Sequence, residues 1–192
     1  MIIWLNGTFG AGKTSTAAEL TKQLAGSRTF DPEWVGYMLK ANLSDHDFTD
    51  FQQLEPWRTL VPVVAAEVAQ YTGQHLVAVQ SVLVRSYWQQ LSAGLRRLGL
   101  EVFHVLLDAP AEVLTERIKA DTVEAGACQW RLDHLADYAA ALPWLTEAAD
   151  LVVDTSAGSA AEVAAVVAAA VGPRLAAAGV PARGAGLQSH LA

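Results

Sequence analysis

The sequence contains a single cysteine and few basic residues for its length. Cys128 has no partner in the chain, which excludes an intramolecular disulfide and suits a reducing compartment. The 13 lysines and arginines are outnumbered by 20 acidic residues, so the net charge is −7 and the pI is about 5.1. Such a chain lacks the basic stripe of a nucleic-acid-binding surface, and we expect no nucleic-acid partner.

Long apolar runs are also missing. A membrane-spanning helix needs about 20 consecutive apolar residues, and no such stretch is present. The longest candidate, residues 160–171, is mostly alanine and is followed by Gly172 and Pro173. The first residues have neither a basic leader nor a cleavage site, so they read as a strand and not as a signal peptide. We therefore expect a cytoplasmic protein without membrane association.

What the sequence does contain is an alternation of short apolar runs and helix-period segments. A length of 192 residues, 52% of them hydrophobic, predicts one domain with a full core. The alternation predicts a doubly wound α/β fold with a mostly parallel five-stranded sheet and the ligand at the carboxyl ends of the strands. This domain is expected to span residues 1–173, followed by a weakly ordered tail at 174–192. The expected strands are 1–5, 27–30, 75–82, 101–107 and 150–154, and the expected helices are 13–24, 33–42, 55–71, 86–98, 111–120, 132–142 and 159–171.

A phosphate-binding loop pattern lies between the first strand and the first helix. Residues 7–14, Gly-Thr-Phe-Gly-Ala-Gly-Lys-Thr, fit G-x-x-x-x-G-K-[ST] in the strand–loop–helix context that the motif requires. The glycines let backbone amides surround an anion, and the helix N-terminus favours negative charge there. Lys13 would add a positive charge for the outer phosphates, and the Thr14 hydroxyl would hold Mg²⁺. The alternative is a glycine-rich turn with a solvated lysine.

Signatures of other nucleotide-binding classes are absent. The Asn-Lys-x-Asp sequence of GTPases does not occur. The apolar run 76–79 ends in Gln80-Ser81, whereas motor and transporter ATPases have Asp-Glu at that point. The remaining class is that of the small-molecule and nucleotide kinases, in which a lid closes over ATP.

Residues 1–14 and the sequence Phe-Asp-Pro-Glu-Trp-Val-Gly at 30–36 resemble the bacterial tunicamycin-resistance protein family. The chain is also similar, more distantly, to chloramphenicol phosphotransferases, shikimate kinases and gluconate kinases. The resemblance is strongest over residues 1–60 and implies an ATP-dependent phosphotransferase with an adenylate-kinase-like core. Members of the family have a membrane-associating amphipathic C-terminus. Here the end is alanine-rich, with only Arg174 and Arg183 as basic residues, so membrane binding is not carried over.

The resemblance implies a catalytic role for the aspartate that follows the second strand. In the similar kinases an aspartate at the position of Asp31 accepts the proton of the attacking hydroxyl. The other interpretation is an N-cap aspartate for the helix that begins at Glu33, and both roles are compatible. Glu33 either holds a metal-bound water or favours the helix N-terminus electrostatically, and we favour the second role.

Basic residues flank a segment expected to be a mobile lid over residues 117–131. Arg117 is the strongest candidate for stabilising the transferred group, with Lys119 and Arg131 behind it. The alternative is a solvated helix face paired with Glu116 and Asp121.

The helices at about 33–72 are expected to bind the acceptor. Arg58 and Arg85 are candidate acceptor contacts, and a surface arginine at a helix start explains each equally well or better. Aromatic residues at these spacings, Trp34, Tyr37, Trp57 and Trp88, either line an acceptor pocket or belong to the core, and the core is the more common outcome.

These residues predict ATP-dependent O-phosphorylation of a small hydroxylated molecule, with Asp31, Lys13 and Arg117 as catalytic residues and Mg²⁺ as the metal. The resemblance points to tunicamycin or a related acceptor, and hence to antibiotic resistance. The alternatives are an ATP-binding protein that sequesters the drug without chemistry, and a metabolite or nucleotide kinase. The sequence does not predict an oligomeric state. The expected nucleotide contacts are Gly7, Gly10, Ala11, Gly12, Lys13, Thr14, Ser15, Arg117 and Thr155.

Overall fold

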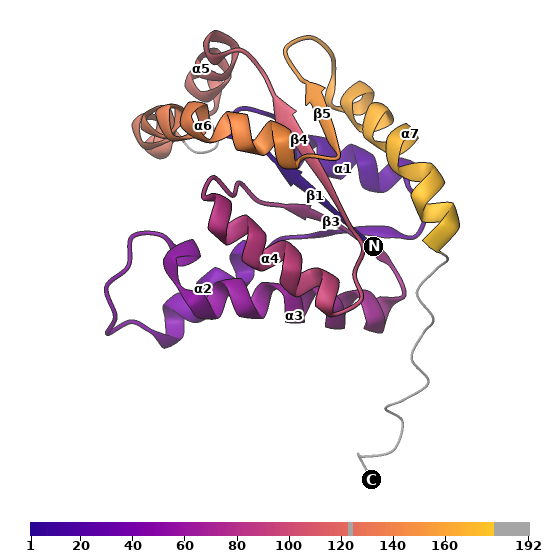
Figure 1. Cartoon of the computed structure of the whole chain (residues 1–192). Helices are drawn as coiled ribbons and strands as arrows, with labels where there is room; N and C mark the ends of the chain where they lie inside the picture. The colour runs from indigo at the N-terminus through magenta and orange to yellow at the C-terminus, as the bar shows by residue number, and fades with distance from the viewer. Residues whose placement is uncertain (123–124, 179–192) are drawn as a thin grey trace.

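The fold is a single parallel sheet covered by helices on both faces (Figure 1). The computed structural model describes residues 1–122 and 125–178. The sheet has five strands in the order β2-β3-β1-β4-β5, and every neighbouring pair is parallel. This confirms the predicted α/β class. The strands are β1 (Ile2–Asn6), β2 (Ser27–Phe30), β3 (His75–Val79), β4 (Val102–Asp108) and β5 (Leu151–Asp154).

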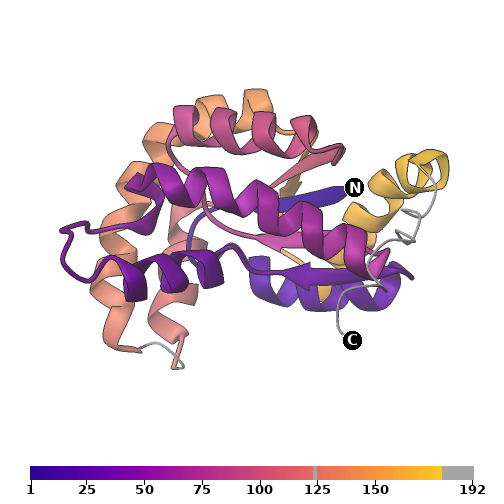
Figure 2. The ribbon, with the colours of Figure 1, turned by 90° about the horizontal axis from the view of Figure 1, so that it is seen from below.

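Because neighbouring strands are parallel, each connection must cross over the sheet, and helices form these crossovers. Helices α1 and α7 pack together on one face, while α3, α4 and α6 cover the other, with α2 against α3 (Figures 1 and 2). The helices are α1 (Lys13–Gln23), α2 (Glu33–Asn42), α3 (Glu55–Thr72), α4 (Arg85–Arg97), α5 (Ala111–Ala120), α6 (Cys128–Ala148) and α7 (Ala160–Ala178), with short 3₁₀ turns η1 (Phe51–Gln53) and η2 (Ala125–Ala127).

The central strand β1 is buried on both sides because its alternating side chains enter two separate cores. Ile3 and Leu5 pack into the core under α1 and α7, together with residues such as Leu20. Ile2 and Trp4 belong to the core under α3 and α4. The continuous apolar run at the N-terminus therefore marks the centre of the sheet, and its carboxyl end at Asn6 leads directly into the phosphate loop.

Two helices are longer than the sequence indicates, and both continue through a proline. Helix α6 starts at Cys128 and ends at Ala148, past Pro143, so residues 128–131 of the segment expected to be a mobile lid are helical. Its buried Tyr138, Ala141 and Leu145 anchor it to the sheet, and this packing outweighs the lost backbone hydrogen bond.

Helix α7 continues through Pro173 to Ala178, so the expected end at residue 171 is wrong and residues 174–178 are not part of an unstructured tail. Arg174 contacts Asp150 at 3.3 Å and lies 4.8 Å from the Phe103 ring centroid, which holds this last turn on the sheet. The rest of the expected tail, 179–192, lies outside the described residues. In the part of the chain that the structure describes, no helix is long and apolar enough to cross a bilayer.

Candidate functional site

The phosphate loop depends on glycines at positions where a side chain would clash or where the backbone conformation disfavours one. Gly7 has a φ of +137°, and a Cβ added there would lie 2.4 Å from the carbonyl oxygen of Leu107 on β4. Gly12 is the N-cap of α1 with a φ of +87°, and it offers no side-chain cap to the first turn. The amides of that turn therefore remain available to an external anion. Thr14 and Ser15, both exposed, lie in this turn.

Gly7→Ala is expected to destabilise the protein by at least about 3 kcal/mol, because it combines a disfavoured backbone conformation with a clash against a strand carbonyl. Urea unfolding monitored by tryptophan fluorescence measures this loss. Gly99→Ala is the matched control: Gly99 also has a positive φ, +80°, yet nothing lies within 4 Å of its added Cβ. The control should lose only about 1 kcal/mol, from the backbone alone. Equal losses would show that the approach to Leu107 is unimportant.

Lys13 lies folded back over the phosphate loop. Its Nζ donates to the carbonyl oxygens of Gly7 at 3.0 Å and Thr8 at 2.8 Å. Burial lowers the pKa of the Lys13 ammonium to about 8, while the nearby Glu33 charge opposes this shift and Arg131 adds to it. The amine is therefore desolvated and adjacent to both an acidic and a basic side chain, as expected of a group that meets a charged ligand.

Asn6 joins the start of the phosphate loop to the segment after β3. Its side-chain oxygen accepts hydrogen bonds from the amides of Gly7 and Val82, each at 2.9 Å, and its Nδ2 donates to the Val82 carbonyl at 3.1 Å. His104 orients this amide. Its Nδ1 lies 3.1 Å from the Ala148 carbonyl, so Nε2 is left to accept from Asn6 at 3.3 Å, and burial lowers the pKa of His104 to about 4, which keeps it neutral. The glycine pattern gives no indication of this clamp.

Asp31 and Glu33 lie where β2 leads into α2. The Asp31 carboxylate accepts a hydrogen bond from the Glu33 amide at 2.9 Å, so the capping contact weighed from the sequence is present. Burial raises the pKa of the Glu33 carboxyl, the neighbouring Asp31 raises it further, and the Tyr37 hydroxyl donates to it at 3.3 Å. Lys13 also acts on the Glu33 pKa. Of this acidic pair, Glu33 thus lies close enough to the phosphate-loop lysine for their charges to interact.

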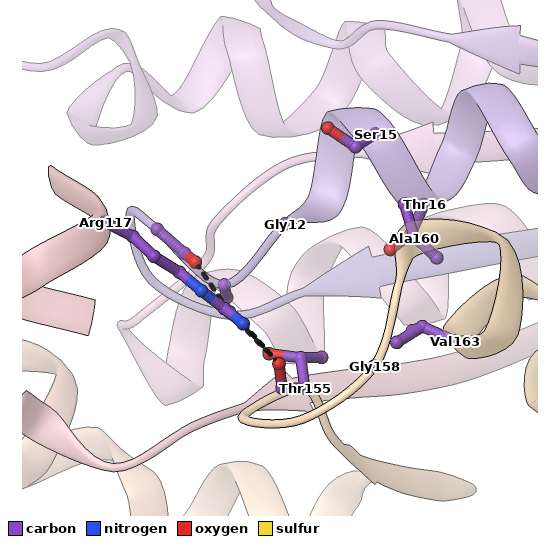
Figure 3. A pocket seen from close by; sticks show the side chains of 10 residues that line it. Gly12, Ser15, Thr16, Arg117, Thr155, Gly158, Ala160 and Val163 are labelled. Carbon is purple, nitrogen blue, oxygen red and sulfur yellow. Dashed lines mark hydrogen bonds between the residues drawn. The ribbon is translucent and has the colours of Figure 1, made fainter. Parts of the chain in front are cut away.

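A cavity of about 240 Å³ lies beside the phosphate loop, between α1 and the loop that precedes α7 (Figure 3). Arg117 crosses it from α5: its guanidinium donates to the Gly10 carbonyl at 3.3 Å, to the Thr155 hydroxyl at 3.2 Å and to the Thr155 carbonyl. Thr155 is fixed in turn because its amide donates to the Asp108 carbonyl at 2.7 Å. The cavity brings together these lining residues: Gly10, Ala11, Gly12, Ser15, Thr16, Arg117, Thr155, Gly158, Ala160 and Val163.

Arg131, ranked low from the sequence, lies against the phosphate loop. Its guanidinium pairs with Asp121 at 2.7 Å and lies 5.4 Å from the ring centroid of Phe9 in the phosphate loop. Trp130 packs edge-on against the same ring, with centroids 5.1 Å apart. Neither Phe9, at a variable position of the loop pattern, nor Trp130, in α6, belongs to a motif, so nothing in the sequence singles them out. Lys119 is exposed at the end of α5.

The candidate acceptor residues are dispersed. Arg58 donates to the Gln90 side chain at 2.6 Å and to the Gln52 carbonyl. Its guanidinium carbon lies 4.4 Å from the centroid of the Tyr87 ring. Arg85 forms an exposed ion pair with Glu147 at 3.1 Å, which matches the surface interpretation.

Among the aromatic residues considered for an acceptor pocket, two belong to the core. Trp57 is fully buried and donates its Nε1–H to the Pro32 carbonyl at 3.1 Å, while Trp88 is 5% exposed and packs against Trp4. A pocket role for these two is therefore wrong, because their rings fill the space between the sheet and α3–α4. Trp34 and Tyr37 are instead exposed on α2, 70% and 52% respectively, and contact each other edge-on at 5.8 Å.

The loop fits a nucleotide phosphate chain by its own chemistry. A Cβ at Gly7 would clash with β4, Lys13 has no partner but carbonyls for its Nζ hydrogen bonds, and the Thr8 hydroxyl is buried with no hydrogen-bond partner among the described residues. The Lys13 ammonium and the Thr8 hydroxyl are donors that an anion with several oxygens would satisfy. Within residues 1–122 and 125–178, no cluster of three or more His, Cys, Asp or Glu residues could hold a metal ion by itself.

Comparisons with known proteins agree with this geometry. A family model described as an AAA domain matches residues 2–132. The structure of the tunicamycin resistance protein of Deinococcus radiodurans is 31% identical in sequence, with 89% of this chain and 95% of that chain covered and a TM-score of 0.67. This match confirms the resemblance seen in the sequence. No curated protein matches the chain.

Solved kinases share the fold at lower identity. A gluconokinase from Sinorhizobium meliloti is 22% identical, with 90% and 91% of the two chains covered and a TM-score of 0.60. The APS kinase of Mycobacterium tuberculosis, in complex with AMPPNP and APS, is 20% identical, with 89% and 96% covered and a TM-score of 0.61. These two show that the chain shares its fold with solved kinases of small molecules.

Proposed function

Because the chain belongs to this AAA-domain family, we propose that it is an ATP-dependent phosphotransferase that acts on a hydroxyl group of a small molecule. The observation that carries the proposal is the phosphate loop, in which Lys13 lies close enough to Glu33 of the acidic pair after β2 for each charge to act on the pKa of the other. A cation for the phosphates and a carboxylate for the acceptor hydroxyl are the parts that phosphoryl transfer needs side by side.

The nucleotide is expected to use the phosphate loop and the adjoining cavity. Backbone amides of residues 10–15 would bind the phosphates, and Lys13 would neutralise the outer ones. Arg117 and Thr155 would contact the base and sugar, since both line the cavity and hold each other in place. The Thr14 hydroxyl is the group that would hold Mg²⁺. Mg·ATP, when bound, supplies the phosphoryl group and part of the positive charge on it.

The chain's own groups then act on the acceptor. Asp31 would orient the attacking hydroxyl and accept its proton, and Lys13 would stabilise negative charge on the transferred group. Of the lid cations, Arg131 is better placed than Arg117 to assist Lys13. Arg131 influences the pKa of Lys13, whereas Arg117 is bonded to Gly10 and Thr155.

Tunicamycin or a related compound with uridine and sugar groups is the proposed acceptor, and resistance the proposed biological role. The support is the 31% identity to a tunicamycin resistance protein. The test is incubation with ATP, Mg²⁺ and panels of nucleosides, sugars, ordinary metabolites and tunicamycin, followed by mass spectrometry. We expect a product heavier by one phosphate group. Absence of such a product from every panel would refute the proposal, and protection of cells with unmodified drug would indicate sequestration instead.

The activity should fall as the pH rises through about 8. Burial lowers the pKa of Lys13 from 10.5 to about 8, so the ammonium that binds phosphate is present below this pH and is lost above it. Because kcat/KM reports the ionisation of the free enzyme, kcat/KM for ATP measured between pH 6.5 and 9.5 should show this limb. At saturating ATP the limb should shift upward, since bound phosphate favours the charged amine. A flat kcat/KM profile to pH 9.5 would contradict the assignment.

A further inference from the structure

The carbonyl oxygens that hold Lys13 each have a second donor. The Gly7 carbonyl also accepts the Ser81 hydroxyl at 2.6 Å, and the Thr8 carbonyl also accepts the Ala11 amide at 3.3 Å. Gly7 is buried and Thr8 is 1% exposed, so water is a poor substitute for a lost partner at either carbonyl. Lys13 can therefore leave both oxygens without stranding them.

Lys13 must make this move if it is to bind phosphate. In the structure its Nζ donates to loop carbonyls, 3.0 Å from the Gly7 oxygen and 2.8 Å from the Thr8 oxygen. A phosphate oxygen competes for the same donor. The affinity for phosphate is reduced by the free-energy cost of breaking the hydrogen bonds between Lys13 and the loop carbonyls.

We propose that Ser81 is a positioning residue that keeps the Gly7 carbonyl satisfied, so that Lys13 is free to exchange from the loop to the nucleotide phosphates. The inference rests on the proposed function, because it assumes that ATP binds at the phosphate loop. Ser81 stands directly after Gln80, at the end of the strand beside β1, where the acidic pair of motor ATPases is missing. At this position the Ser81 hydroxyl instead donates a hydrogen bond to the Gly7 carbonyl of the phosphate loop.

The hydroxyl is not needed to hold the two segments together. Asn6 already joins Gly7 to Val82 through its side-chain oxygen and amide, and the Gln80 amide donates to the Leu5 carbonyl at 3.3 Å. With Lys13 in its loop position, the Gly7 carbonyl also has a donor whether or not Ser81 is present. Removal of the hydroxyl should thus matter little for the free protein and should matter when the phosphates draw Lys13 away.

The test is a comparison of wild type, Ser81→Ala and Ser81→Thr, each titrated with Mg·ATP and with adenosine by calorimetry or NMR. Ser81→Ala should weaken ATP binding about tenfold, because a buried carbonyl is then left unpaired in the complex. Adenosine, which has no phosphate to attract Lys13, should bind as to wild type. Ser81→Thr keeps the hydroxyl and should restore ATP affinity, and thermal unfolding without nucleotide should differ little among the three proteins.

The outcomes separate the inference from the proposed function. If wild type binds ATP and Ser81→Ala binds it equally well, the positioning role is wrong and the kinase proposal stands. If Ser81→Ala weakens ATP and adenosine by the same factor, the residue only maintains the structure, and the inference is again wrong. If wild type itself does not bind ATP, the proposed function fails, and this inference fails with it.

Discussion

Asp31→Asn is expected to slow phosphoryl transfer by roughly 10²- to 10⁴-fold, the usual contribution of a general base. The asparagine oxygen can still accept the hydrogen bond from the Glu33 amide, so the start of α2 should be unchanged. What the variant loses is a carboxylate able to take the proton of the acceptor hydroxyl. Steady-state kinetics with the acceptor identified by the mass-spectrometric screen measure the effect, which should fall on kcat with ATP affinity preserved.

Asp50→Asn is the matched control for this substitution. Asp50 makes the same local contact as Asp31. At the start of η1, its carboxylate accepts a hydrogen bond from the amide of Gln52, two residues further on, at 2.8 Å. Its conversion to asparagine also removes one negative charge near Glu33. Asp50→Asn should therefore retain turnover within a few-fold. If both variants are equally active, Asp31 is a cap and not a base. Glu33, which has a pKa raised by burial, is then the next carboxylate to replace.

Features that depend on local sequence were predictable. The strand–loop–helix at residues 1–24 follows from an apolar run, three glycines with positive φ and a helix-period segment, and all of these are set within a few residues of each other. The Asp31 contact with the Glu33 amide likewise spans one turn. Such features can be derived because the chemistry that fixes them is contiguous in the chain.

Features that depend on distant partners were not predictable. Helices α6 and α7 continue through Pro143 and Pro173 because buried faces on the sheet hold them, which no local pattern around a proline reveals. The contacts of Ser81 with Gly7 and of Asn6 with Val82 join segments more than 70 residues apart. The fold class could thus be read from periodicity, while the arrangement of the loop's supports required the three-dimensional structure.

Among the arginines, sequence position alone ranked Arg117 ahead of Arg131 as the cation for the transferred group. Arg117 and Arg131 flank the same segment of the chain. The structure distinguishes them, since Arg117 is bonded across the cavity to Thr155 and Arg131 lies over Phe9 near Lys13. Contacts between segments distant in the chain distinguish the two arginines, and spacing alone does not reveal such contacts.

Lys13→Met is expected to lower kcat by roughly 10²- to 10³-fold, the loss that follows removal of one preorganised donor to a developing negative charge. The same variant should be as stable as wild type at pH 7, or more stable. The lowered pKa means that burial disfavours the charged form of Lys13 in the folded protein. Below pH 8 the charged amine therefore destabilises the folded state. Methionine also leaves no carbonyl unpaired, because Ser81 and Ala11 still donate to Gly7 and Thr8.

Opposite effects on activity and stability are the diagnostic result, and they are measured by kcat and by urea unfolding at pH 7. Lys22→Met is the matched control: Lys22 is exposed on the same helix and forms a surface ion pair with Glu19 at 2.7 Å, so its removal should change neither quantity appreciably. The stability gain of Lys13→Met should also shrink as the pH rises from 8 towards 10.5, because the wild-type amine is then neutral when folded. A variant that loses stability and activity together would show that Lys13 holds the loop in shape and is not poised for the phosphates.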